Sequence, residues 1–203
     1  MTTRTARGWK RAARNRSAGG AGMYVPQRRK LLADLTGTVL EIGPGAGANT
    51  AHFGRDVRWL GLEPNPYLHE RLREKARGQV IGGAAESIPL ADHSVDAVVG
   101  TIVLCSVYDQ SRVLAEIVRV LRPGGRYVFL EHVAAPDGTW SRWAQKTVAP
   151  VSRWLDGGCD PARETGRAID AAGFDRVETE EFLLHGPFGV KIPHLTGWAS
   201  TAG

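Results

Sequence analysis

Five short apolar runs occur in the first two thirds of the chain, and each predicts a strand. The runs cover residues 38–42, 58–62, 79–82, 95–101 and 126–131. The run at 95–101 is almost continuously apolar, which is typical of a strand buried on both faces of a sheet.

Between these runs, apolar residues recur at the spacing of an amphipathic helix. In residues 110–121, Val113, Leu114 and Ile117 share one face, and Asp109 suits the capping position before the first turn. The same reasoning predicts helices at 26–35, 67–76 and 161–172, a helix at 140–155 that Pro150 interrupts, and a short helix ending near Phe53.

The order of these elements predicts an α/β fold. Strands that alternate with helices form parallel sheets with right-handed crossovers, so the five runs should build a doubly wound sheet. Two further strands, at about 176–183 and 192–200, have only a loop between them. We therefore expect an antiparallel hairpin at one edge of a mostly parallel, seven-stranded sheet.

The composition is that of one globular domain. The chain has 203 residues, of which 42% are apolar and 23% are charged, enough for a single core. The longest apolar stretch, 97–107, is too short to span a bilayer, and no secretory signal is visible. With two cysteines and no metal-ligand spacing of Cys or His, we expect a cytoplasmic protein without a disulfide framework or a metal.

Basic charge is concentrated at the amino terminus. Nine of the 26 Lys and Arg lie in residues 1–30, which hold no acid, so the rest of the chain carries more acids than bases. We expect residues 1–22 to form a basic flexible arm and residues 23–203 to form the domain, with Arg28 facing outward from the first helix. Because the domain itself is mildly acidic, we do not expect a nucleic-acid partner.

A glycine-rich turn follows the first apolar run directly. Gly43, Gly45 and Gly47 carry no side chains, so the backbone can bend sharply and let a ligand approach closely. Asn49 or Thr50 could then cap a helix. A strand, a glycine turn and a helix together bind nucleotide-like ligands at the carboxyl edge of a parallel sheet.

Glu63 stands at the end of the second strand, twenty residues beyond Gly43, and Pro64 follows it. Dinucleotide-binding folds place an acid at this distance to accept the ribose hydroxyls. A carboxylate can accept both O–H groups at once. We therefore predict that Glu63 binds a ribose.

The G-x-G-x-G spacing, with Glu41 two residues before the first glycine, resembles motif I of class I S-adenosylmethionine (SAM)-dependent methyltransferases of the type 11 group. Residues 83–90 resemble the loop that holds the adenine of SAM in that family. Residues 120–125 resemble the turn before its fifth strand. The resemblance implies a Rossmann-like class I methyltransferase fold, with SAM as cofactor and S-adenosylhomocysteine as product.

The same resemblance implies a set of cofactor-binding residues. The family's adenine-binding acid is replaced here by Ala84, so Glu86 or the backbone of Ala85 would take over that contact. Backbone carbonyls after the fourth strand would face the sulfonium and its methyl group. The implied cofactor-binding residues are Glu41, Gly43, Gly45, Gly47, Glu63, Pro64, Ala85, Glu86, Thr101 and Leu104.

Four segments narrow the resemblance to the membrane-associated alkyl thiol methyltransferases. These segments are residues 101–107, 131–135, 158–159 and 193–199, and the likeness covers about 30–199. The likeness does not extend to the amino terminus, where those relatives carry a hydrophobic anchor and this chain has a polar, basic arm. The resemblance implies a small-molecule thiol substrate and gives no support to membrane insertion.

Methylation of a thiol calls for a base, because the thiolate is the nucleophile. His132, at the end of the fifth strand, is the predicted catalytic base, and His194 is a second candidate. Cys105 could line the substrate site or be a small buried hydrophobe. Trp140 could cover an apolar substrate or pack in the core, as could Trp143 and Trp154. The predicted substrate-binding residues are Cys105, His132, Trp140 and His194.

Two other activities fit part of the pattern. Methylation of a hydroxyl group, such as a phenol, would use the same base and the same alignment, so it stays open beside S-methylation. A NAD-dependent oxidoreductase would share the sheet and the ribose acid. The G-x-G-x-G spacing and the turn at 122–125 argue against it.

Overall fold

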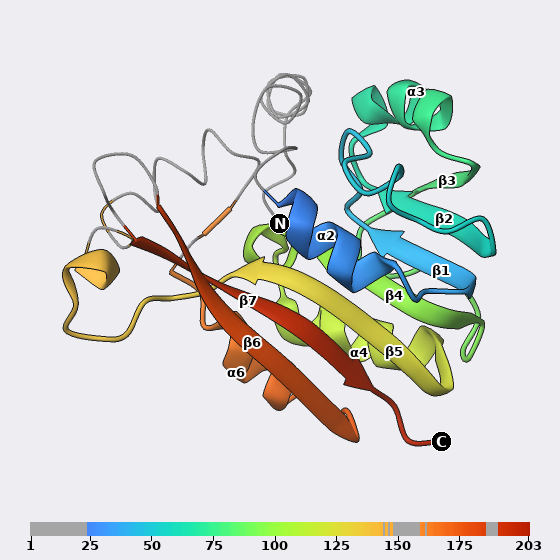
Figure 1. Cartoon of the computed structure of the whole chain (residues 1–203). Coiled ribbons are helices and arrows are strands. Elements are labelled where there is room, and N and C mark those ends of the chain that lie inside the picture. The colour runs from blue at the N-terminus through green and yellow to red at the C-terminus, as the bar shows by residue number, and fades with distance from the viewer. Residues whose placement is uncertain (1–23, 144, 146, 148–158, 161, 186–190) are drawn as a thin grey trace.

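A single sheet is the frame of the described chain. The computed structural model describes residues 24–143, 145, 147, 159, 160, 162–185 and 191–203. The strands of this sheet are β1 (Gly37–Ile42), β2 (Val57–Glu63), β3 (Gly78–Gly82), β4 (Val95–Thr101), β5 (Leu121–His132), β6 (Arg176–His185) and β7 (Lys191–Ser200). They lie side by side in the order β3-β2-β1-β4-β5-β7-β6 (Figure 1).

The pairing within this sheet confirms the predicted topology. β1 to β5 run parallel to one another, whereas β7 runs antiparallel to both β5 and β6. The last strand therefore lies between β5 and β6, and the hairpin forms one edge of the sheet. In this register His132 at the end of β5 lies opposite His194 of β7.

Helices cover both faces of the sheet. α2 (Val25–Leu32) lies over one face, and α4 (Gln110–Val120) and α6 (Thr165–Asp170) lie over the other, while α3 (Pro66–Lys75) packs beside β3 (Figure 1). The doubly wound arrangement is therefore confirmed, and every parallel strand is covered from at least one side.

The residues of β4 show why both faces are buried. Ala97 and Val99 pack in one apolar cluster with Leu32 of α2, and Val98 packs in another with Ile117 of α4. Successive side chains of a strand point to opposite faces. A continuous apolar run is thus needed wherever a strand has helices on both sides.

α4 begins and ends where the sequence predicts. The Asp109 side chain accepts the N–H of Arg112 at 3.0 Å, which satisfies a donor of the first turn. The helix ends at Val120, before the 122–125 turn. β5 nevertheless starts earlier than predicted, at Leu121, because the turn is an irregular part of the strand. Val95 pairs with Leu121, and Ala97, two residues later, pairs with Arg126.

Three local predictions are wrong. Residues 43–56 form turns instead of a helix, because the glycines adopt left-handed backbone angles and the Asn49 side chain is drawn to Glu41 instead of capping. Arg28 is buried instead of outward, with its guanidinium over the Tyr24 ring. The helix predicted at 161–172 is shorter, since the Asp160 side chain holds a turn before α6 by accepting the N–H of Ala162.

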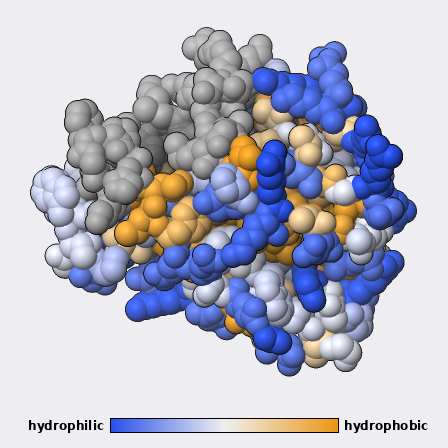
Figure 2. Space-filling model, in the orientation of Figure 1, coloured by the Kyte–Doolittle hydropathy of each residue, from blue (hydrophilic) through white to orange (hydrophobic). Residues whose placement is uncertain are grey.

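Some predictions lie outside the described residues: the basic arm at 1–22, the interruption at Pro150 and the role of Trp154. Within the described part, no helix combines the length and the apolar character needed to cross a membrane. On the face shown in Figure 2, hydrophilic residues cover much of the surface, and apolar surface gathers over the upper part of β6 and β7. Leu183 of β6 is among the exposed apolar side chains.

Candidate active site

The glycine turn forms the floor of the candidate site at the end of β1. Gly43, Gly45 and Gly47 have φ angles of 59°, 60° and 77°, a region that side chains rarely tolerate. A Cβ atom at Gly43 would lie 2.6 Å from Cγ2 of Val103. The structure thus provides the close-approach backbone that the sequence predicts, and Gly43 is also needed for packing against the loop after β4.

Glu63 is brought directly to this turn. Its carboxylate is buried at the end of β2, where it accepts the N–H of Gly45 at 2.9 Å and the N–H of Asn65 at 2.8 Å. The Asn65 side chain in turn caps α3 by accepting the N–H of Tyr67. These bonds fix the carboxylate beside Gly45, and a carboxylate retains further lone pairs for hydroxyl donors.

The buried carboxylate of Glu41 makes its hydrogen bonds to other side chains of the protein. Its two oxygens accept the side-chain N–H groups of Asn49 at 2.9 Å and Trp59 at 2.8 Å. Burial raises the pKa of Glu41 to about 7, and the bonds from Trp59 and Asn49 partly offset that rise. The side chain therefore orients Asn49 under the glycine turn.

Asn49 also reaches β4, because its amide nitrogen donates to the Thr101 hydroxyl at 3.0 Å. Its amide oxygen is buried and accepts no hydrogen bond from the described residues. A buried acceptor without a donor is costly, and an ammonium group at this position would satisfy it. The predicted cofactor fits here, since SAM carries an ammonium group and the side-chain-free turn accommodates a ligand close to the backbone.

The loop after β3 contains the two predicted adenine contacts. Ala85 is buried, as a backbone wall for a ligand requires. The Glu86 carboxylate accepts the N–H of Tyr108 at 2.7 Å, and its carbonyl accepts from the Arg112 side chain at 2.8 Å. Glu86 thus ties this loop to the segment before α4.

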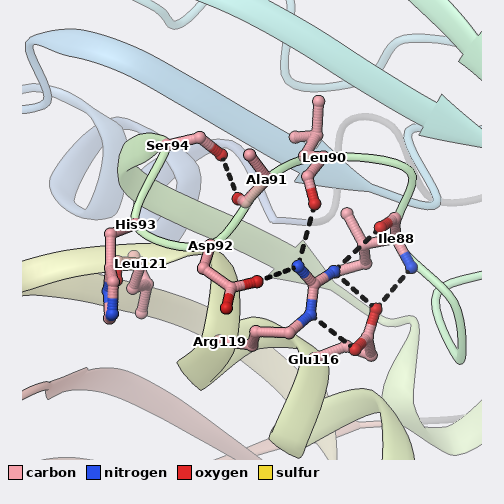
Figure 3. Close-up of polar contacts among 9 residues, drawn as sticks. All are labelled: Ile88, Leu90, Ala91, Asp92, His93, Ser94, Glu116, Arg119 and Leu121. Carbon is pink, nitrogen blue, oxygen red and sulfur yellow. Dashed lines mark hydrogen bonds and ion pairs between the residues drawn. The ribbon is translucent and has the colours of Figure 1, made fainter.

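Arg119 of α4 holds the rest of this loop (Figure 3). Its guanidinium donates to the carbonyls of Ile88 and Leu90, each at 2.9 Å, and pairs with Asp92 at 2.7 Å. Glu116 accepts two of its N–H groups and also the N–H of Ile88. The planar fork of arginine therefore sets the path of the loop that carries Ala85.

A buried acid organises the loop after β4. The Glu131 carboxylate accepts the N–H groups of Val103 and Leu104, both at 3.0 Å. Burial raises its pKa to about 7, and the bonds from Leu104 and Val103 oppose the rise. Ile102 has a φ of 53°, an unfavourable angle for a β-branched residue. The loop that begins after Thr101 is thus strained and held by Glu131.

Cys105, His132 and Cys159 form one cluster at the end of β5. The Cys159 sulfur lies 3.2 Å from the Cys105 sulfur and 3.4 Å from Nδ1 of His132. Both cysteines are buried and neither forms a disulfide. The neighbouring Cys159 thiol and burial raise the pKa of Cys105 well above its usual value.

A chain of hydrogen bonds determines which ring nitrogen of each histidine carries the proton. Ile192 offers a carbonyl to Nδ1 of His194 at 2.9 Å, so that nitrogen carries the proton. Nε2 of His194 then accepts the Tyr24 hydroxyl proton at 2.9 Å, and Tyr24 accepts Nε2–H of His132 at 3.2 Å. Burial lowers the pKa of His194 to about 4, which keeps it neutral. In the tautomer of His132 that carries its proton on Nε2, Nδ1 is the nitrogen that faces Cys159.

Trp140 and Trp143 do not pack in the core. Trp140 is 69% exposed and Trp143 is 56% exposed, and their rings stack at 4.5 Å. The predicted contact of Trp140 with substrate stays a prediction. A separate groove of about 590 Å³ lies between α2 and the hairpin, lined by residues that include Leu31, Phe182 and Trp198 and by none of the predicted site residues.

Sequence reasoning missed four residues that build the site. Asn49 was expected only as a possible cap, Glu131 had no assigned role, Tyr24 had no recognisable motif, and Cys159 was not a predicted site residue. Asn49 and Glu131 could have been identified by their positions, since each is a polar residue beside the end of a strand. Tyr24 and Cys159 come from distant segments, and no local pattern predicts their approach.

Comparisons with known proteins agree with this geometry. The methyltransferase-domain family model matches residues 40–129. Thiol S-methyltransferase TMT1A of Homo sapiens is 36% identical over 170 residues, covering 80% of this chain and 70% of that protein. Thiol S-methyltransferase TMT1B of Homo sapiens is 35% identical over 192 residues, covering 85% and 78%.

A solved structure shares the fold. A SAM-dependent methyltransferase from Thermotoga maritima superposes with a TM-score of 0.67, covering 95% of this chain and 99% of that one at 18% identity. The fold, the glycine turn and the sequence identity to the two human proteins all indicate the same family. The chain therefore belongs to the SAM-dependent methyltransferase family that includes the thiol S-methyltransferases, and it is an enzyme of that class.

Proposed function

We propose that this methyltransferase acts on the sulfur of a small, fairly apolar thiol. The two human relatives are named thiol S-methyltransferases, which supports sulfur as the acceptor atom. The observation that carries the proposal is the position of His132, whose ring is held by Tyr24 and His194 and whose Nδ1 lies 3.4 Å from the Cys159 sulfur.

SAM, when bound, supplies an electrophilic methyl group on a sulfonium. We assign Glu63 to the ribose, the backbone around Ala85 to the adenine, and Asn49 to the ammonium group. The glycine turn and the backbone at Thr101 and Leu104 would line the cofactor between these anchors. Support comes from the buried carboxylate of Glu63 and the open acceptor of Asn49.

The acceptor needs two things from the chain. It must be aligned with the methyl carbon, which can supply a large part of the rate enhancement. It must also lose its proton, because an alkyl thiol is mostly protonated near neutral pH and only its thiolate attacks. His132 is the residue we assign to that proton, since its Nδ1 can accept it while Tyr24 stabilises the ring position.

The direct test is a panel of thiols and phenols incubated with SAM and the purified chain. We expect methylated thiols, and we expect His132→Gln to lower kcat by ~10²-fold or more, with the greatest loss at low pH. The matched control is His93→Gln, because His93 lies outside the site. Methylation of phenols alone would favour a hydroxyl acceptor, and no methylation of any thiol would overturn the proposal.

We also propose a cytoplasmic location. Cys105 and Cys159 form no disulfide although their sulfurs lie 3.2 Å apart, and a reducing compartment keeps such pairs reduced. Fractionation of cells producing the tagged chain, with thiol alkylation before lysis, tests this. Recovery as a disulfide in an exported fraction would contradict it.

A further inference from the structure

The cluster of Cys105, His132 and Cys159 contains three metal-binding side chains. The ligand atoms, two sulfurs and one imidazole nitrogen, all lie within 4.8 Å of one another. They come from three separate segments: the 3₁₀ turn at Leu104–Ser106, the end of β5, and the residues before α6. The tertiary fold therefore assembles the group, and linear spacing gives no sign of it.

The donor set matches one class of ion. Thiolates and imidazole nitrogens select Zn²⁺ and similar soft divalent ions, whereas Mg²⁺ and Ca²⁺ prefer oxygen ligands. Zinc bonds of about 2.0–2.3 Å at tetrahedral angles put neighbouring ligands about 3.5–3.8 Å apart. The observed separations of 3.2 Å and 3.4 Å are slightly shorter, so a small opening of the cluster would admit the ion.

Hydrogen bonds with Tyr24 and Asp160 hold the ligands in place. The Tyr24 hydroxyl accepts Nε2–H of His132, which leaves Nδ1 as the ligand nitrogen. The backbone carbonyl of Cys105 accepts the N–H of Asp160 at 2.9 Å, so the two cysteine segments are tied together beside the cluster. Bonds of this kind orient the side chains that bind a metal and are needed for full metal affinity.

We propose that Cys105, His132 and Cys159 bind one Zn²⁺ and leave its fourth position for the sulfur of the substrate. Three protein ligands with one open position are typical of catalytic zinc sites. Zinc binding itself depends only on these three side chains. The assignment of the fourth position rests on the proposed thiol methylation.

The proton balance of such a site is simple. The two cysteines release their protons to solvent when the ion binds, and a thiol that takes the fourth position releases one more. The substrate sulfur then forms the new bond to the methyl carbon. The bond from that carbon to the sulfonium breaks, and its electron pair stays on the departing thioether. In this arrangement His132 ligates the ion, and this role replaces that of a base toward the substrate proton, so chelation of the metal distinguishes the two roles.

Metal content and spectroscopy test the site without relying on activity. The reduced full-length chain is stripped with a chelator, titrated with Zn²⁺ in a calorimeter, and assayed for bound metal after gel filtration. We expect one Zn²⁺ per chain, and with Co²⁺ we expect thiolate charge-transfer absorption. Absence of stoichiometric Zn²⁺ from the reduced protein, or Co²⁺ spectra without thiolate bands, would overturn the proposal.

Variants identify the ligands. Cys105→Ser, Cys159→Ser and His132→Asn should each weaken Zn²⁺ binding at least tenfold, whereas His93→Asn should leave it unchanged. SAM affinity, measured on the same samples, reports whether each variant is folded. If a variant fails to fold, protection of both wild-type cysteines from alkylation by Zn²⁺ replaces it as the test. Equal alkylation with and without Zn²⁺ would contradict the assignment.

Activity separates this inference from the proposed function. Chelated enzyme should still bind SAM but should lose thiol methylation, and Zn²⁺ should restore it. Full thiol methylation by chelated enzyme would refute the role of the metal and leave His132 as the base. Stoichiometric zinc binding without methylation of any thiol would confirm the metal site and refute the thiol substrate.

Discussion

The buried carboxylate of Glu63 accepts the backbone N–H of Gly45 at 2.9 Å. This bond joins the end of β2 to the turn after β1, so two of the predicted cofactor contacts form one unit. A ligand that binds the carboxylate also contacts a turn whose shape the carboxylate controls.

Glu63→Gln should therefore weaken SAM binding by about 10–100-fold, because charge-assisted hydrogen bonds contribute about 1.5–3 kcal/mol. The amide keeps the size of the side chain but turns an NH2 group toward the N–H of Gly45 or Asn65, so the free energy of unfolding should also fall, by about 1–3 kcal/mol. Calorimetric titration with SAM measures the effect, with the exposed Glu70→Gln on α3 as the control. Unchanged SAM affinity in Glu63→Gln would remove this residue from the ribose site.

Gly43→Ala should destabilise the fold and impair cofactor binding. The substitution combines an unfavourable φ of 59° with a Cβ contact of 2.6 Å to Val103, and we expect a loss of about 1–3 kcal/mol or more. Gly173→Ala is a matched control, because Gly173 has a φ of 83° but nothing within 4 Å of its Cβ position. Equal losses of stability in the two variants would mean that the contact with Val103 contributes nothing.

The stability of the protein should fall as pH rises through the range set by Glu41. Burial holds the folded-state pKa of Glu41 at about 7, above its ordinary value of 4.5, although Trp59 and Asn49 oppose the shift. Between these values the folded protein keeps a proton that the unfolded chain releases. The free energy of unfolding should thus decrease from about pH 4.5 to pH 7.

Glu41→Gln should remove part of that decrease, ~1–3 kcal/mol over the range. Glutamine can accept from Trp59 and donate to the oxygen of Asn49 once the Asn49 amide turns over. Urea denaturation at several pH values measures the effect. Because Glu131 also has a pKa of about 7, some slope should remain, but identical slopes for the variant and the wild type would contradict the prediction.

Arg119→Lys should loosen the loop that carries Ala85. Lysine cannot reach Ile88, Leu90 and Glu116 together, so several bonds to loop backbone are lost (Figure 3). We expect faster amide hydrogen exchange in residues 85–92 and a stability loss of about 1–2 kcal/mol, with SAM binding weakened several-fold. Arg73→Lys on the exposed side of α3 is the control, and unchanged exchange in the loop would count against the role of Arg119.

The sequence predicts the sheet well because the features that set it are local. Apolar runs of the right length, the cap at Asp109 and the absence of a helix between the last two strands each act within a few residues. The prediction fails where a local preference competes with a tertiary contact. Asn49 is a suitable cap, but the buried carboxylate of Glu41 binds its amide more favourably.

The site is only partly predictable for the same reason. The glycine turn and Glu63 are recognisable because their spacing along the chain reflects the βαβ repeat. The cluster around His132 depends on Tyr24, Cys159 and His194, which approach only after the sheet has formed. Their side-chain chemistry is visible in the sequence, but their proximity is a property of the three-dimensional fold.

The place of β7 has a consequence for biosynthesis. The ribosome makes this strand after the other six, yet it lies in the interior of the sheet, and among the described strands it is the only partner of β6. Until it inserts, the nascent chain has an open edge at β5 that invites wrong pairing. Because His194 arrives with that strand, deletion of residues 191–203 would split the sheet and leave the histidine cluster unfinished, so the chain cannot be active before β7 has been translated.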